Sequence, residues 1–157
     1  MKMLFEYNWQ VREEWFDWCS QVPEEELVRE REGGLGSILR TLFHIVDIEQ
    51  AWINGLQGVP EFHYTYEDYS SLEEIKALSQ RCRPQVETII RQWSDEMDRK
   101  MFYSFSYAEV IRHVAVHEIH HVGQLSVWSR QIGLPPITAN LILRGLSLDG
   151  SYNEKLL

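Results

Sequence analysis

Cysteine and positive charge are both scarce in this 157-residue chain. The two cysteines, Cys19 and Cys82, are far apart and form no C-x-x-C pair, so the sequence predicts neither a disulfide framework nor a thiolate metal site. Lysine and arginine together number 15, against 24 aspartates and glutamates, and the formal net charge is −9. Such a charge opposes binding to nucleic acid, because phosphates attract clusters of cationic side chains.

Long apolar runs are also missing. The N-terminus reaches a charged residue before any apolar stretch of signal-peptide length. No run of about 18 apolar residues, the length needed to span a membrane, follows anywhere in the chain. From these shortages we expect a cytoplasmic protein that binds neither nucleic acid nor membranes.

Four segments carry the apolar period of amphipathic helices, and none of the stretches between them alternates clearly enough to predict a sheet. Serines that can act as N-caps precede the second, third and fourth segments, and glycines or prolines follow several of their ends. The predicted helices run from about Leu4 to Ser20, Ser37 to Leu56, Ser71 to Lys100 with Pro84 as a possible kink, and Ser106 to Gly133.

The remaining segments are expected to be connections and a tail. Residues 24–32 are acidic and are predicted to be a solvated connection, and residues 59–69 a loop. A short fifth helix is predicted from Thr138 to Leu146, before a loose tail after Asp149. The length suits a single domain over residues 1–157. We therefore expect an all-α, four-helix bundle of the up-down-up-down type with a short C-terminal extra helix; crossovers at the first and third connections are the alternative.

Histidines are concentrated in the fourth predicted helix, where four of the six lie between positions 113 and 121. Imidazole is the commonest protein ligand for zinc and similar ions, and two histidines four apart project from one helical face. At about 100° per residue, His117 and His121 fall at or inside the edge of the apolar arc, whereas His113 and His120 fall outside it. The sequence therefore predicts that His117 and His121 bind a metal ion.

A third ligand is expected from another segment, since zinc sites with binding or catalytic roles commonly use three protein ligands and leave one position open. His44 is the favoured candidate because it lies in the middle of the second predicted helix, at the edge of its apolar arc. His63 lies in the following loop and is the alternative third ligand. If it is not a ligand, we expect it to be a solvated loop residue or part of the rim of a pocket.

Residues His117 to His121 also match H-E-x-x-H, the metalloprotease motif in which Glu118 would be the general base. Gln124 and Val127 stand where the longer form of that motif requires glycine and histidine. Outside the protease reading, Glu118 is expected to be an exposed helix residue. The helical wheel instead places it near 140°, inside the apolar arc, where it would need a partner such as an Arg or Lys from another helix.

These features together resemble the DinB family over nearly the whole chain. The residues that carry the resemblance are His44 on the second helix, the run His117-x-x-His120-His121-x-Gly123-Gln124, the Ser37 helix start, Glu49, Trp52 and the tryptophan-rich first helix. The resemblance implies that His44, His117 and His121 are the metal ligands, and it favours a homodimer. Val122 departs from the pattern, because relatives often carry arginine there.

The family includes metal-dependent transferases and isomerases that use thiols such as bacillithiol or mycothiol, and many members without a known reaction. The first hypothesis is therefore a thiol-dependent S-transferase, in which a divalent metal binds a low-molecular-weight thiol as thiolate for attack on an electrophile. Zinc and nickel are the first candidates for a site of three imidazoles, and iron, cobalt and manganese also accept such ligands. Glu49 is either an acceptor for an imidazole N–H or part of a partly exposed salt bridge. The alternatives are a non-catalytic metal-binding or interaction protein, and a metal-dependent hydrolase.

Overall fold

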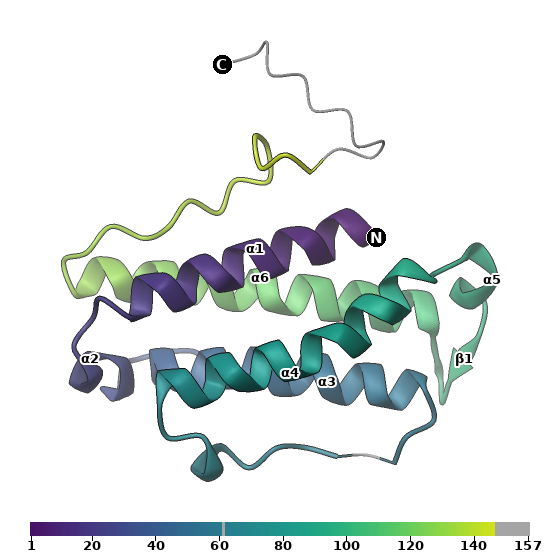
Figure 1. Cartoon of the computed structure of the whole chain (residues 1–157), viewed down its shortest axis with the longest axis horizontal. Helices are drawn as coiled ribbons and strands as arrows, with labels where there is room; N and C mark the ends of the chain where they lie inside the picture. The colour runs from purple at the N-terminus through teal and green to yellow at the C-terminus, as the bar shows by residue number, and fades with distance from the viewer. Residues whose placement is uncertain (61, 147–157) are drawn as a thin grey trace.

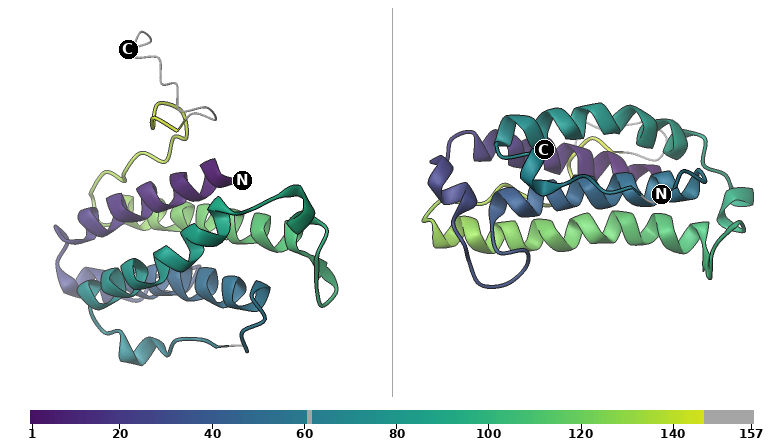
Figure 2. Two further views of the ribbon diagram at one scale, coloured as in Figure 1. Left: turned by 45° about the vertical axis from the view of Figure 1, so that its right-hand side comes forward. Right: turned by 90° about the horizontal axis from the view of Figure 1, so that it is seen from below.

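Four long helices lie roughly along one common axis in the computed structural model, which describes residues 1–60 and 62–146 (Figures 1 and 2). They are α1 (Lys2–Cys19), α3 (Ile38–Leu56), α4 (Leu72–Arg91) and α6 (Tyr107–Gln131). The shorter elements are α2 (Glu24–Val28), the 3-10 turn η1 (Tyr66–Asp68), α5 (Asp95–Asp98) and the antiparallel strands β1 (Met101–Phe102) and β2 (Phe105–Ser106). The all-α class predicted from the sequence is confirmed.

Serine caps begin three of the long helices at the positions that the sequence predicts. Ser37 accepts a hydrogen bond from the Arg40 N–H, which starts α3. Ser71 and Ser106 form complete capping boxes with the glutamates three residues later, which start α4 and α6. Because each cap satisfies backbone N–H groups that the helix itself leaves unpaired, these starts are set locally.

The order of the helices differs from the predicted up-down-up-down arrangement. Helices α1 and α6 are parallel, because Asn8 contacts Ala115 and Arg12 contacts Glu118 further along both. The first turns of α3 and α4 share one core cluster and their last turns share another, so these two are also parallel. The long helices therefore run up, down, down and up, and residues 57–60 and 62–71 return along the bundle (Figure 1).

The crossover is thus the second connection, and not the first or third. Helix α3 has 19 residues and is about 28 Å long at 1.5 Å per residue. The second connection can span that distance, because an extended chain covers about 3.3 Å per residue. Its length, rather than any motif within it, allows the parallel arrangement.

Three segments differ from their predicted secondary structure. Residues 24–28 form helix α2, because Leu27 packs into the core rather than facing solvent. The third long helix ends at Arg91, and Ser94 then caps the separate α5, which places the half-buried Trp93 against the core. The β1–β2 hairpin joins α5 to α6 where no strand was predicted.

The predicted fifth helix at residues 138–146 does not form. Side chains of α1 hold this segment instead: the Tyr7 hydroxyl donates to Ala139 O, and Glu14 forms an ion pair with Arg144. Leu143 also has a φ of 70°, which a right-handed helix does not accommodate. The predicted tail after Asp149 lies outside the described residues.

Two hydrophobic clusters fill the bundle, and polar residues lie between them on the helices that carry the histidines. One cluster contains Trp15 and Leu125, and the other contains Phe5 and Ile53. On α3 the clusters are separated by Glu49 and Gln50, and on α6 by Glu118 and His121. Within residues 1–60 and 62–146, none of the helices combines the length and apolarity needed to cross a bilayer.

Candidate metal centre

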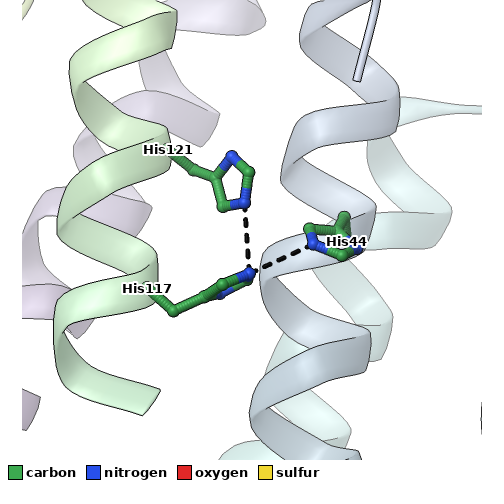
Figure 3. A group of neighbouring side chains, drawn as sticks. All are labelled: His44, His117 and His121. Atoms are coloured by element: carbon green, nitrogen blue, oxygen red, sulfur yellow. Dashed lines mark hydrogen bonds between the residues drawn. The ribbon is translucent and has the colours of Figure 1, made fainter. Parts of the chain in front are cut away.

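Three histidines from two helices converge at the level of this polar layer. His44 comes from α3, and His117 and His121 come from one face of α6, a turn apart (Figure 3). The antiparallel packing of α3 against α6 brings His44 opposite His117 and His121. One ring nitrogen from each lies within 4.8 Å of the others. His121 is buried, and the other two are half-buried.

The rings cannot satisfy one another by hydrogen bonding alone. His117 Nε2 lies 3.1 Å from His44 Nε2 and also 3.1 Å from His121 Nε2. A neutral imidazole nitrogen carries either one hydrogen or one lone pair, so His117 Nε2 can form only one of these two hydrogen bonds. A cation at the centre would instead take a lone pair from each nitrogen. The donor set therefore fits a divalent metal ion such as zinc, with a coordination position left open.

Gln124 orients one of the three rings. Its side-chain oxygen lies 2.8 Å from His121 Nδ1 and can only accept a hydrogen bond, so this Nδ1 carries the hydrogen and His121 Nε2 carries the lone pair. The Gln124 amide nitrogen donates to His120 Nε2 at 2.9 Å. Partners of this kind fix the tautomer and the direction of a metal-binding imidazole.

Gly34 leaves the space in which Gln124 sits. A Cβ atom at position 34 would lie 2.6 Å from the Gln124 side-chain oxygen, and the Gly34 φ of 52° also favours glycine. A larger residue would displace the amide that holds His121. The sequence alone indicates only that Gly34 interrupts the chain before α3; its contact with α6 depends on the tertiary fold.

The surroundings keep the three imidazoles neutral. Burial lowers the pKa of His44 and of His121. Burial and the neighbouring imidazoles lower the pKa of His117 to about 3. Neutral imidazole is the form that binds metals, so at neutral pH all three rings are in the binding form.

The other histidines lie outside this group. His113 and His120 are exposed on α6, as the helical wheel predicts. The His113 ring lies 5.8 Å from that of His117 and 5.6 Å from that of Trp52. His63 Nδ1 lies 2.8 Å from an Asp47 carboxylate oxygen, which ties the loop to α3. Of the two predicted candidates for the third position, the structure brings His44, and not His63, to the pair on α6.

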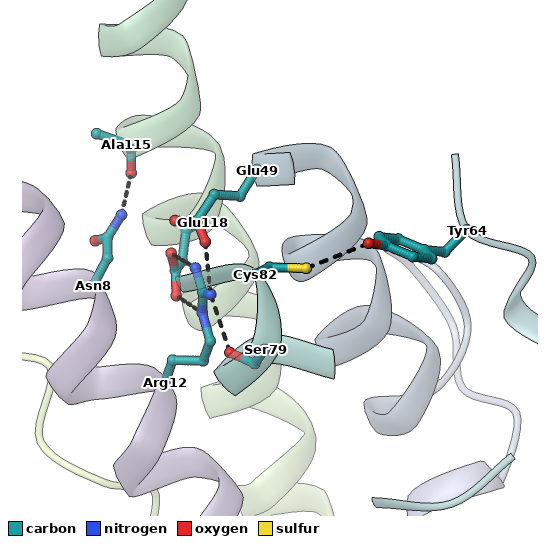
Figure 4. A network of polar contacts seen from close by, with 8 residues as sticks. All are labelled: Asn8, Arg12, Glu49, Tyr64, Ser79, Cys82, Ala115 and Glu118. Carbon is teal, nitrogen blue, oxygen red and sulfur yellow. Dashed lines mark hydrogen bonds and ion pairs between the residues drawn. The ribbon is translucent and has the colours of Figure 1, made fainter. Parts of the chain in front are cut away.

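A buried charge network links α1 to both histidine-bearing helices (Figure 4). Arg12 donates from Nε and Nη2 to the two Glu118 carboxylate oxygens at 2.8 and 2.6 Å, and from Nη1 to Glu49 at 2.9 Å. All three side chains are nearly inaccessible. Burial raises the pKa of Glu118, although Arg12 opposes that rise.

This network settles the roles expected for its carboxylates. The reading of Glu118 as an exposed residue is wrong, and its alternative, a buried group paired with an arginine from another helix, is what the structure shows. Glu49 is in an ion pair as one of its alternatives predicted, but the pair is fully buried rather than partly exposed, and no described imidazole donates to Glu49. Sequence reasoning missed Arg12, although its spacing from Asn8 and Phe16 places it on the buried face of α1.

Comparisons with known proteins agree with these observations. The model of the DinB family matches residues 1–145. A protein of Bacillus subtilis (strain 168) named "Uncharacterized protein YizA" is 40% identical to this chain, and the similarity covers 97% of this chain and 100% of that protein.

Proposed function

The chain belongs to the DinB family, and we propose that His44, His117 and His121 hold a divalent metal ion for an enzymatic reaction. Zinc and nickel are the first candidates, since three imidazoles suit both, and iron, cobalt and manganese also accept such ligands. The reaction that we propose is the transfer of a low-molecular-weight thiol to an electrophile. The convergence of three neutral imidazole nitrogens, with no hydrogen-bonding arrangement that satisfies them, supports the metal-binding part of this proposal.

Each residue has a defined part in the proposed site. A divalent ion there would lower the pKa of a coordinating thiol and so supply a thiolate at neutral pH. The three histidines would bind the ion through Nε2, and Gln124 holds His121 in the tautomer that leaves this nitrogen free. Arg12 bonds to α3 through Glu49 and to α6 through Glu118, and so helps to set the separation of the two helices that carry the histidines.

The hydrolase alternative has less support. A metalloprotease needs the glutamate of H-E-x-x-H as a general base beside the metal. Here both Glu118 oxygens accept hydrogen bonds from Arg12 of α1, and the residue is 3% exposed. A buried carboxylate in such a pair is unsuited to taking a proton from a water molecule at the histidines. A metal-binding protein without catalysis remains the main rival.

Metal-dependent thiol conjugation tests the proposal. The protein is stripped of metal, reloaded with zinc or nickel, and incubated with a low-molecular-weight thiol and 1-chloro-2,4-dinitrobenzene while the absorbance of the conjugate is recorded. We expect the loaded protein to accelerate conjugation, and the stripped protein and loaded His117→Ala to match the background rate. Full metal binding with conjugation at the background rate would support the non-catalytic rival instead.

We also propose that the protein is a cytoplasmic homodimer. Both cysteines are free and buried, which suits a reducing compartment. Val116, Ile119 and Val127 are exposed apolar residues on α6, and a second copy of the chain could cover them. Light scattering after gel filtration tests the assembly: a mass of about one chain would contradict the dimer.

A further inference from the structure

A cavity of about 570 Å³ lies beside the C-terminal half of α3. Its size is within the range of small-molecule sites, roughly 300 to 1,000 Å³. Its walls come from α3, from the segment after α3 and from the β1–β2 hairpin. The lining residues are Ile48, Ala51, Trp52, Gly55, Gly58, Val59, Pro60, His63, Phe102, Tyr103 and Phe105.

Two routes of contact connect this cavity to the three histidines. Ile48 lies one turn after His44 on the same face of α3, a rise of about 6 Å. On the other side, the Trp52 ring lies 5.6 Å from His113, whose ring lies 5.8 Å from that of His117. The walls of the cavity are therefore linked to the histidine group by one helical turn of α3 and, through His113, by a chain of ring contacts.

The aromatic wall is built by close contact between α3 and the hairpin. The Phe102 ring packs directly on Gly55, where an added Cβ would lie 2.7 Å from a ring carbon. The Trp52 and Phe102 rings meet edge to face, with centroids 6.2 Å apart. Gly55 is therefore needed for the hairpin to approach the helix and present its aromatic residues to the cavity.

Tyr103 stands at the rim in a conformation that costs energy. Its φ is 51°, in the left-handed region that bulky residues rarely adopt, and its side chain is 87% exposed. A glycine would fit this turn without strain. The exposed ring does little for the core, so core packing does not explain why a strained aromatic residue occupies this position at the edge of the cavity.

The chemistry of the walls selects the ligand. Apart from the His63 imidazole, which already lies 2.8 Å from an Asp47 carboxylate oxygen, the described lining residues carry no carboxylate, ammonium or guanidinium group, so a charged ligand would lose its hydration with little ionic compensation. Four of them, Trp52, Phe102, Tyr103 and Phe105, are aromatic. Aromatic rings pack favourably against the faces and edges of other rings, beyond the gain from burying apolar area.

The geometry points to this cavity as the binding site of an uncharged, planar aromatic electrophile, the second substrate of the transfer proposed above. This inference rests on that proposed function for the chemistry, but not for the binding. In the transfer, the thiol sulfur forms a bond to a ring carbon, and the bond from that carbon to its leaving group breaks. The leaving group departs as an anion with the bonding electron pair, and the thiol proton passes to solvent.

Binding is tested without any reaction by titrating 1,3-dinitrobenzene, which has no leaving group, into the metal-loaded protein in a calorimeter. Ala51→Phe fills the cavity from a half-buried wall position, and Ala77→Phe adds the same ring at an exposed position of α4. We expect Ala51→Phe to weaken binding by about tenfold or more, and Ala77→Phe to leave it unchanged. Equal binding by both variants, or equally tight binding of n-octanol by the wild type, would overturn the inference.

Tyr103→Gly is a second variant that does not depend on filling the cavity. Relief of the left-handed strain should raise the melting temperature by about 2 °C, while loss of the ring should weaken dinitrobenzene binding by about fivefold. A variant that is more stable and binds as tightly as the wild type would contradict the role of Tyr103.

The two proposals fail in different ways. Dinitrobenzene binding that Ala51→Phe abolishes, together with a background rate of conjugation, would support the aromatic site and contradict the transferase. Metal-dependent conjugation that Ala51→Phe leaves unchanged would support the transferase and place its electrophile outside this cavity.

Discussion

Replacing Arg12 with methionine would remove the only cation from the buried network that joins α1, α3 and α6 among the described residues. Methionine keeps much of the length of the side chain but leaves Glu49 and Glu118, each 3% exposed, without their shared partner. Removing one partner of a buried pair typically costs about 3 to 5 kcal/mol, because the remaining charge stays desolvated. In a chain of this length, that loss lowers the melting temperature by roughly 6 to 20 °C.

The loss of stability in Arg12→Met should depend on pH through the pKa of Glu118. Burial raises the pKa of Glu118 even with Arg12 present, and removing the cation raises it further. A carboxyl whose pKa is higher in the folded than in the unfolded protein stabilises the fold below the unfolded pKa, and this stability is lost as the pH rises. The difference between wild type and Arg12→Met should therefore be largest near pH 7 and shrink toward about pH 4, near the unfolded pKa of glutamate.

Urea unfolding at pH 7 and at lower pH measures both effects. Arg91→Met is the matched control, since Arg91 forms an ion pair with Glu87 at the surface of α4 and its side chain is 67% exposed. Exposed helix pairs contribute about 0.3 to 0.5 kcal/mol, so this control should unfold almost as the wild type does. A loss below about 1 kcal/mol for Arg12→Met at pH 7, or a loss independent of pH, would refute the reasoning.

Three further predictions concern residues around the histidines. Gln124→Ala should weaken metal binding by about 10- to 100-fold, measured by competition with a chelator, because His121 loses the acceptor that fixes its tautomer; unchanged affinity would remove Gln124 from the site. Glu118→Gln should lower the stability to urea but leave the metal content near that of the wild type, since the amide keeps the shape and part of the hydrogen bonding; loss of metal would show that the carboxylate itself is required. His63→Ala should leave metal affinity unchanged while His44→Ala lowers it, and the reverse result would move the third ligand to the loop.

Local signals explain which parts of the fold the sequence predicts well. The starts of α3, α4 and α6 depend on serine and glutamate residues within one turn, so they can be read without knowing the rest of the structure. That His117 and His121 project from the same face follows from the period of a single helix. The convergence of His44 with them needs the packing of two helices, and the resemblance to a family supplied what spacing could not.

The errors arise where tertiary contacts override local patterns. Residues 138–146 have apolar residues compatible with a helix, but Tyr7 and Glu14 of α1 bind this segment in an extended form with a turn. The parallel course of α3 and α4 depends on the reach of residues 57–71, which contain no signal for direction. Arg12 and Gly34 matter through contacts with residues about a hundred positions away, and a linear pattern does not reveal such contacts.

The metal content of untagged protein, purified without a nickel column and measured by elemental analysis, tests the central claim most directly. We predict about one divalent ion per chain in the wild type and in His113→Ala, whose histidine is exposed on the same helix. His117→Ala and His121→Ala should lose most of the metal, because two imidazoles and solvent would remain. Metal loss in His113→Ala with retention in His117→Ala, or a wild type that takes up no metal even after loading, would contradict the account.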